Sequence, residues 1–97
     1  MKILIVEDEE SYREPLVYQL TREGYDVSAA DTGEEGLELF TKGGIDLVLL
    51  DLMLPFQSGY HWCAELRKIS NVPVMFLSSA ADNLNIVTAM NMGADGR

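Results

Sequence analysis

The chain has one cysteine, three prolines and no long hydrophobic run in its 97 residues. The single cysteine, Cys63, cannot form an intrachain disulfide, which fits a reducing compartment. The first apolar run, residues 3–6, meets acid at Glu7 and is too short for the core of a signal peptide. No run approaches the ~20 residues that span a membrane. We therefore expect a cytoplasmic protein without a membrane-spanning segment.

Basic residues are also scarce: seven lysines and arginines stand against 16 acidic residues, for a formal net charge of −9. Such a surface repels nucleic acid phosphates, so this chain is not expected to bind DNA by itself. Acidic clusters can instead hold a hard cation such as Mg²⁺. They can equally make a soluble surface, and composition alone does not choose between these two interpretations.

Four short segments have the pattern of strands. Residues 3–6, 47–50 and 74–77 are continuously apolar, which is typical of strands covered by helices on both sheet faces. Residues 25–29 alternate between apolar and polar side chains, which favours an edge strand with one wetter face. The 97 residues are enough for one domain, 1–97, and too few for two.

Segments with helical spacing separate these strands. One helix is expected over 11–23, a second from a capping box at Thr32 and Glu35 to the glycines at 43–44, and a third over 60–69. Asp82 can cap a fourth helix, whose apolar residues are Ile86, Val87, Met90 and Met92.

Strand and helix thus alternate four times, which predicts an α/β fold with a doubly wound parallel sheet. No further strand is expected after the fourth helix. The strand at 74–77 is therefore predicted to be an exposed sheet edge, a feature that promotes self-association. On this interpretation the fold is incomplete at its carboxyl terminus.

Polar side chains follow three of the expected strands. Glu7 and Asp8 follow the first, Asp51 the third, and Ser78 the fourth. The carboxyl ends of parallel strands meet at one end of the sheet, where ligands of such folds bind. Three carboxylates there would repel one another, and a divalent cation that prefers oxygen ligands removes the conflict. The cluster therefore predicts a Mg²⁺ site.

Each residue also has a simpler explanation. The acids at 7–10 precede a helix, whose amino terminus favours negative charge. Asp51 could merely end a strand, and the serines at 78–79 could merely belong to a loop. The combination at three equivalent strand ends is what favours a site.

Three blocks of the sequence, residues 3–10, 46–55 and 73–78, resemble the signature blocks of response-regulator receiver domains. The likeness spans essentially the whole chain, and its details resemble receivers fused to winged-helix DNA-binding domains. The resemblance implies a flavodoxin-like fold with strand order 2-1-3-4.

The resemblance also implies roles for the polar cluster. Asp51 would accept a phosphoryl group from a histidine kinase or a small phosphodonor. Asp8 would ligate Mg²⁺ directly and Glu7 through water, and the main-chain carbonyl of Met53 would complete the protein ligands. Ser78 would hydrogen-bond a phosphoryl oxygen, with Ser79 ranked second.

Two departures from the family pattern stand out. Phe56 replaces a glycine that is common at that position, which predicts a differently shaped loop beside Asp51. Family members also continue into a fifth strand, which carries a lysine and an aromatic residue, and into a fifth helix. Arg97 does not occupy the place of that lysine.

Three functions follow as hypotheses. The favoured one is a phosphoacceptor module, not an enzyme, that controls transcription through a DNA-binding domain of the full-length regulator. The second is a truncated receiver that folds or self-associates, through its exposed sheet edge or fourth helix, without switching. The third is a Mg²⁺-dependent aspartyl phosphatase, which is disfavoured because such enzymes generally place a second aspartate where this chain has Met53.

Overall fold

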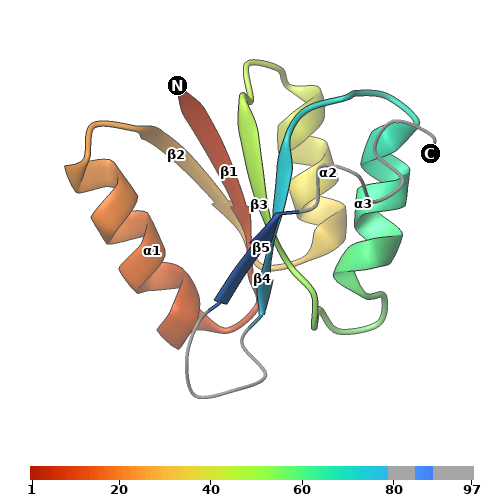
Figure 1. Ribbon diagram of the computed structural model, residues 1–97, viewed down its shortest axis with the longest axis horizontal. Helices are drawn as coiled ribbons and strands as arrows, with labels where there is room; N and C mark the ends of the chain where they lie inside the picture. Colours follow the sequence, from red (N-terminus) through yellow and green to blue (C-terminus); the bar gives the residue numbers. More distant parts are fainter. Residues whose placement is uncertain (79–84, 89–97) are drawn as a thin grey trace.

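The computed structural model describes residues 1–78 and 85–88. Within them the strands are β1 (Lys2–Val6), β2 (Asp26–Ala30), β3 (Leu47–Asp51), β4 (Val74–Ser78) and β5 (Asn85–Thr88). The helices are α1 (Glu10–Arg22), α2 (Gly33–Thr41) and α3 (Gly59–Arg67). The strands form one sheet in the order β2-β1-β3-β4-β5 (Figure 1).

The sheet lies between two layers of helix. α1 covers one face, and α2 and α3 cover the other (Figure 1). Alternate residues of β1 serve the two layers: Ile3 and Ile5 belong to the apolar cluster beside α1, whereas Leu4 and Val6 belong to the cluster beside α2 and α3. This two-sided burial is the reason that the central strands are continuously apolar.

The first four strands confirm the predicted α/β class and the order 2-1-3-4. All pairings among β1–β4 are parallel. β2 lies at one edge of the sheet, as its alternating sequence predicted, and it buries only its last residue. The predicted cap of α2 is also confirmed, since Thr32 Oγ1 accepts a hydrogen bond of 3.0 Å from the Glu35 N–H.

The predicted fourth helix is wrong over residues 85–88. These residues form β5, which pairs antiparallel with β4 and places Ser78 opposite Asn85. β4 is therefore not the free sheet edge that we expected. Two physical reasons account for the error. The run 86–88 is β-branched, which favours a strand, and a short apolar run fits helical and extended spacing alike.

The remaining residues of that predicted helix, including Asp82, Met90 and Met92, lie outside the described residues. Ser79 and Arg97 lie outside them as well.

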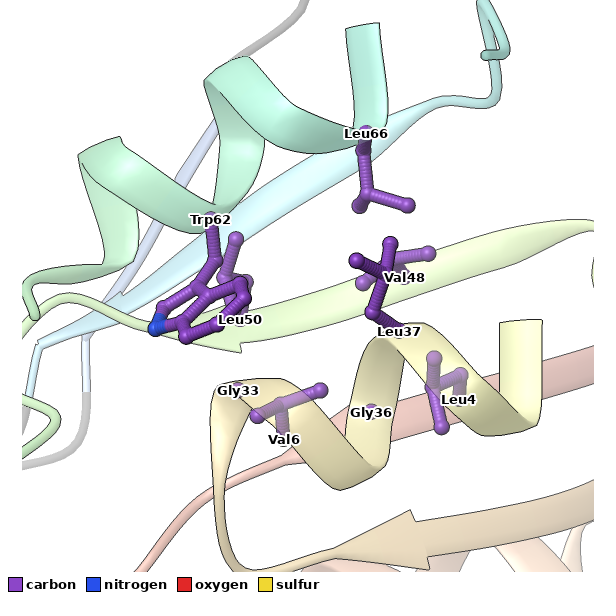
Figure 2. Close-up of a pocket in the computed structure, with 9 residues that line it drawn as sticks. All are labelled: Leu4, Val6, Gly33, Gly36, Leu37, Val48, Leu50, Trp62 and Leu66. Atoms are coloured by element: carbon purple, nitrogen blue, oxygen red, sulfur yellow. The ribbon is translucent and has the colours of Figure 1, made fainter. Parts of the chain in front are cut away.

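Two glycines of α2 allow close packing on the face of the sheet that α2 and α3 share (Figure 2). A Cβ atom at Gly33 would lie 2.2 Å from the indole of Trp62, and one at Gly36 would lie 2.6 Å from Val6 Cγ2. The apolar void that remains there has a volume of about 10 Å³. It is too small for a ligand, so this region is core and the functional site must lie elsewhere.

Candidate functional site

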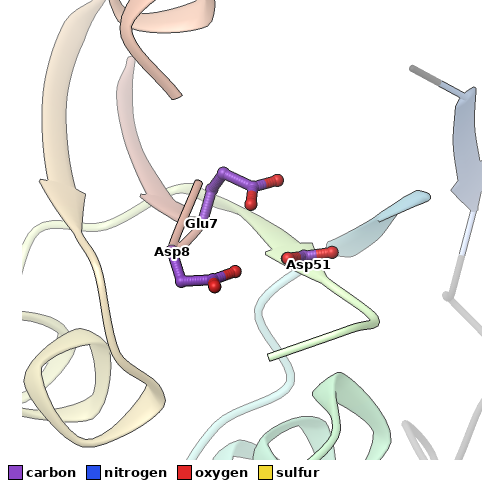
Figure 3. A group of neighbouring side chains, drawn as sticks. All are labelled: Glu7, Asp8 and Asp51. Carbon is purple, nitrogen blue, oxygen red and sulfur yellow. The ribbon is translucent and has the colours of Figure 1, made fainter. Parts of the chain in front are cut away.

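Three carboxylates meet at the carboxyl ends of β1 and β3. The two strands are parallel neighbours, with Val6 opposite Leu50, so Glu7 and Asp51 occupy equivalent positions at the ends of their strands. Asp8 follows Glu7 and turns toward the same place (Figure 3). One oxygen from each of the three side chains lies within 4.8 Å of the others. The convergence that we predicted from the sequence is therefore confirmed.

The three carboxylates differ in exposure. Glu7 is 0% exposed and Asp51 is 1% exposed, whereas Asp8 is exposed to solvent. Removing a carboxylate from water disfavours its ionised form unless a cation or hydrogen-bond donors compensate. Glu7 and Asp51 thus form the buried floor of the site, and Asp8 lies at its solvent-exposed mouth.

Burial raises the pKa of both floor residues. The pKa of Glu7 rises from 4.5 to about 8, mainly through burial, while the N–H of Glu9 lowers it and the neighbouring Asp51 carboxylate raises it further. Burial is also the main reason that the pKa of Asp51 is raised, against the lowering effect of the Met53 N–H. Without a cation, the pair therefore holds at least one proton at neutral pH.

Hydrogen bonds satisfy only one oxygen of each floor residue. Glu7 Oε2 accepts from the Glu9 N–H at 3.0 Å, and Asp51 Oδ1 accepts from the Met53 N–H at 3.0 Å. The other oxygens, Glu7 Oε1 and Asp51 Oδ2, are buried and have no hydrogen-bond partner among the described residues. Buried polar atoms without partners are rare and point to a ligand.

This donor set fits Mg²⁺. The ion takes oxygen ligands, tolerates water in its remaining positions and is held by few carboxylates. Two orphaned carboxylate oxygens on the floor and the exposed Asp8 carboxylate at the mouth match that requirement.

Two further residues shape the site, and we did not single them out from the sequence. Arg13 Nη1 donates a hydrogen bond of 3.0 Å to the carbonyl oxygen of Glu7 and so ties α1 to the end of β1. Gly59, the first residue of α3, packs on the main chain of Asp51: an added Cβ would lie 2.3 Å from the Asp51 carbonyl oxygen. The Gly59 N–H also donates to the Leu52 carbonyl at 3.0 Å. These contacts join residues six to eight positions apart in different elements, and they depend on how the connecting loops fold rather than on a local sequence motif.

The other residues predicted for the site are less fully described. Met53 follows Asp51 by two residues, and its side chain is 63% exposed, so only its main chain faces the cluster through the N–H bond to Asp51. The metal-ligand role of its carbonyl stays a prediction. Ser78 ends β4 one position beyond Leu77, the register partner of Asp51. The role of its hydroxyl group also stays a prediction.

No helix in the described part of the chain is both long and apolar enough to cross a membrane.

Comparisons with known proteins identify the family of this chain. The family model described as the response regulator receiver domain matches residues 3–97. Over 93 residues the chain is 46% identical to the probable transcriptional regulator ycf27 of Cyanidium caldarium and 42% identical to the sensory transduction protein RegX3 of Mycolicibacterium smegmatis. Both matches cover 96% of this chain but only 37% and 41% of the relatives. The chain thus spans about two fifths of the length of these curated relatives.

Solved structures show the same likeness. One is the response regulator TrrA of Thermotoga maritima in complex with Mg²⁺-BeF, with a TM-score of 0.75, 39% identity and coverage of 80% of this chain and 69% of that one. A complex of the histidine kinase ThkA with TrrA matches with a TM-score of 0.76, 38% identity and coverage of 82% and 70%. With the family model spanning nearly all residues and the acidic cluster at the expected strand ends, this chain belongs to the response-regulator receiver domain family.

Proposed function

We propose that this chain is a phosphoacceptor switch module, in which Asp51 receives a phosphoryl group from a histidine kinase and Mg²⁺ assists the transfer. One observation carries the proposal: Glu7 and Asp51 are buried together, each with one carboxylate oxygen that has no partner among the described residues. A purely structural acid at a strand end would be solvated or fully hydrogen-bonded.

The chain's own groups can perform the transfer. A carboxylate oxygen of Asp51 forms a bond to phosphorus while the bond from phosphorus to the donor breaks. In a phosphohistidine donor that bond is P–N, and the imidazole nitrogen leaves with the electron pair and takes up a proton. The product is an acyl phosphate on Asp51. The Met53 N–H, which donates to Asp51 Oδ1, fixes the orientation of the carboxylate for this attack.

We assign the metal ligands to Glu7, Asp8 and Asp51, with the main-chain carbonyl of Met53 as a further one. When bound, Mg²⁺ would offset the negative charge on the phosphoryl oxygens and on the three carboxylates. Asp8 is the exposed member of the set, so it lies where an incoming cation first meets the protein. Ser78 is assigned to hydrogen-bond a phosphoryl oxygen.

The output proposed for this switch is transcriptional. The two relatives described above are named as a transcriptional regulator and a sensory transduction protein, and this chain matches less than half of each. The net charge of −9 disfavours DNA contact by this chain, so we assign DNA binding to another domain of the full-length regulator. The module itself turns over no external substrate and is not an enzyme in that sense.

The phosphatase hypothesis finds no support in the site. It requires an acid two residues after the nucleophile, and Met53 occupies that position with its side chain turned to solvent.

Phosphorylation is testable directly. The protein is incubated with Mg²⁺ and acetyl phosphate, and its intact mass is measured. We expect the addition of one phosphoryl group that hydroxylamine removes, as befits an acyl phosphate. The Asp51→Asn variant keeps the size of the side chain and should gain nothing. A folded wild-type protein that gains no phosphate would refute the proposal and support the hypothesis of a receiver that does not switch.

A further inference from the structure

A second surface feature lies on the same side of the sheet as α2 and α3. It is a pocket of about 290 Å³ between the first turn of α2 and the loop from β3 to α3. We call it the Phe56 pocket; it is lined by Thr32, Gly33, Glu34, Pro55, Phe56 and Trp62. None of these residues belongs to the acidic cluster.

Phe56 is held in an unfavourable state at the rim of this pocket. Its ring is fully exposed, and its φ angle is 71°, in the left-handed region that side chains rarely adopt. Both the exposed ring and the strained backbone are costs that the isolated chain does not recover. Strained backbone of this kind clusters at functional sites, which makes Phe56 a candidate for one.

The part of the pocket wall that Trp62 forms is rigid. The Trp62 indole packs directly on Gly33, where even a Cβ atom would overlap it (Figure 2). The His61 ring also meets the indole edge to face, with centroids 4.9 Å apart. An aromatic side chain that cannot turn away presents a preformed surface to a ligand.

The acidic side chains around the pocket favour a positively charged ligand. Glu34 lines the pocket and is exposed, and Asp31 and Glu35 flank it on the same turn. Asp31 and Glu35 are linked by a hydrogen bond of 3.3 Å from the Asp31 N–H to Glu35 Oε1. The Glu34 carboxylate has no hydrogen-bond or ion-pair partner among the described residues and is available to a cation. Thr32 caps the Glu35 N–H of α2, and the exposed Glu34 carboxylate in the pocket lining disfavours an anionic ligand.

We propose that the Phe56 pocket binds an arginine side chain presented on an apolar segment of a partner protein. The guanidinium plane would stack on the aromatic rings of Phe56 and Trp62 and pair with Glu34, while neighbouring apolar residues of the partner cover Phe56. A second copy of this chain is a poorer occupant, because each copy carries a net charge of −9 and the same acidic turn.

The test uses a capped tripeptide with arginine between two leucines. Its matched control carries citrulline, which has nearly the same shape and no charge. Trp62 is the chain's only tryptophan, so its fluorescence reports the pocket without labelling. We expect a saturable change with the arginine peptide and affinity about threefold to tenfold lower with the citrulline peptide. Added salt should weaken only the arginine peptide.

Three variants sharpen the test. Glu34→Gln should lower the affinity for the arginine peptide by about threefold to tenfold, whereas Glu38→Gln, an equal charge change on the same helix outside the pocket, should not. Phe56→Gly removes the ring, suits the positive φ and should also weaken binding. Asp51→Asn should bind the peptide as well as wild type, which separates this proposal from phosphorylation.

Several outcomes would overturn the proposal. They are equal affinity for the two peptides, equal loss in Glu34→Gln and Glu38→Gln, and no saturable fluorescence change in a wild-type protein that circular dichroism shows to be folded. A dimer that forms in sedimentation experiments and is lost in Phe56→Gly would also overturn it, because a second copy would then be the occupant of the pocket.

Discussion

Glu7 and Asp51 lie side by side at the ends of adjacent parallel strands, both almost completely buried and each with one oxygen that lacks a hydrogen-bond partner among the described residues. The pair is unfavourable when both side chains are ionised and no cation is present. The protein can relieve this in two ways, by taking up a proton or by binding a metal ion. Two predictions test these alternatives.

The first prediction concerns pH in the absence of metal. The pKa of Glu7 is about 8 in the folded protein against 4.5 ordinarily, so between these values the folded state binds more protons than the unfolded state. The free energy of unfolding should therefore fall as pH rises through this window, by roughly 1.4 kcal/mol per pH unit for each extra proton held. Asp51, whose pKa is also raised, acts in the same direction. Urea unfolding in EDTA at several pH values measures the trend.

Glu7→Gln is the control for this prediction, because the amide has the size of the protonated acid and does not titrate. The variant should show a shallower dependence between pH 5 and 8, the window set by the Glu7 shift, and should be the more stable protein at its upper end. A wild-type stability that is flat or rises with pH would show that Glu7 is ionised in the folded state.

The second prediction concerns Mg²⁺. On the proposed function the ion binds the folded cluster and has no comparable site in the unfolded chain, so it should stabilise the protein by about 2.7 kcal/mol at a free concentration of about 100 times the dissociation constant. Thermal unfolding at pH 8 with increasing Mg²⁺ measures the effect. Lowering the pH should diminish it, since protons and Mg²⁺ compete for Glu7 and Asp51.

Asp8→Asn separates metal binding from folding. Asp8 is exposed, so its loss should not lower the stability of the metal-free protein, yet it should weaken the response to Mg²⁺. An unchanged Mg²⁺ response in this variant would remove Asp8 from the set of ligands.

The third prediction concerns Gly59. Its replacement by alanine would place a Cβ 2.3 Å from the Asp51 carbonyl oxygen, and the main chain must shift to accommodate it. We expect Gly59→Ala to destabilise the protein by about 1–3 kcal/mol, as overpacking does, and to slow phosphorylation by displacing Asp51. Urea unfolding and the rate of phosphate uptake measure the two effects.

Gly43→Ala serves as the comparison. Gly43 has a φ of 95° and nothing within 4 Å of an added Cβ, so its replacement strains only the local backbone. It should cost about 1 kcal/mol and leave the rate of phosphate uptake unchanged. Equal rates for the two variants would show that the contact of Gly59 with Asp51 does not position the acceptor.

The fourth prediction concerns Phe56. Its backbone is in the left-handed region, and its exposed ring has no packing to lose. Phe56→Gly should therefore stabilise the protein, by about 1 kcal/mol, because glycine adopts a positive φ without steric cost. Phe56→Ala removes the ring but keeps the strain, so it should have the stability of wild type. Chemical denaturation of the three proteins distinguishes strain from packing, and equal stabilisation by glycine and alanine would contradict this explanation.

The central strands and the acidic cluster could be read from the sequence for physical reasons. A strand covered on both faces must be continuously apolar, so the apolar runs at residues 3–6, 47–50 and 74–77 could be predicted as buried strands. Parallel neighbours place their carboxyl ends together, so Glu7, Asp8 and Asp51 had to converge once the strand order was known. The cap at Thr32 was predictable because it depends on residues only three apart.

The incorrect helix prediction for residues 85–88 arose because local sequence does not determine their structure. Their sequence fits a helix turn or a strand, and the choice depends on whether a pairing partner is available. The open side of β4, the strand that precedes these residues in the chain, offers unpaired main-chain groups that β5 satisfies.

The sequence by itself determined which residues form β1 to β4 and which acids gather at the end of the sheet, because both follow from local periodicity and parallel topology. Only the tertiary structure decided that Glu7 and Asp51 are buried with unsatisfied oxygens, that Gly59 touches the Asp51 main chain and that Phe56 and Trp62 line the same pocket. These relationships depend on packing distances of a few ångströms between segments. The periodicity of a sequence does not specify distances that short.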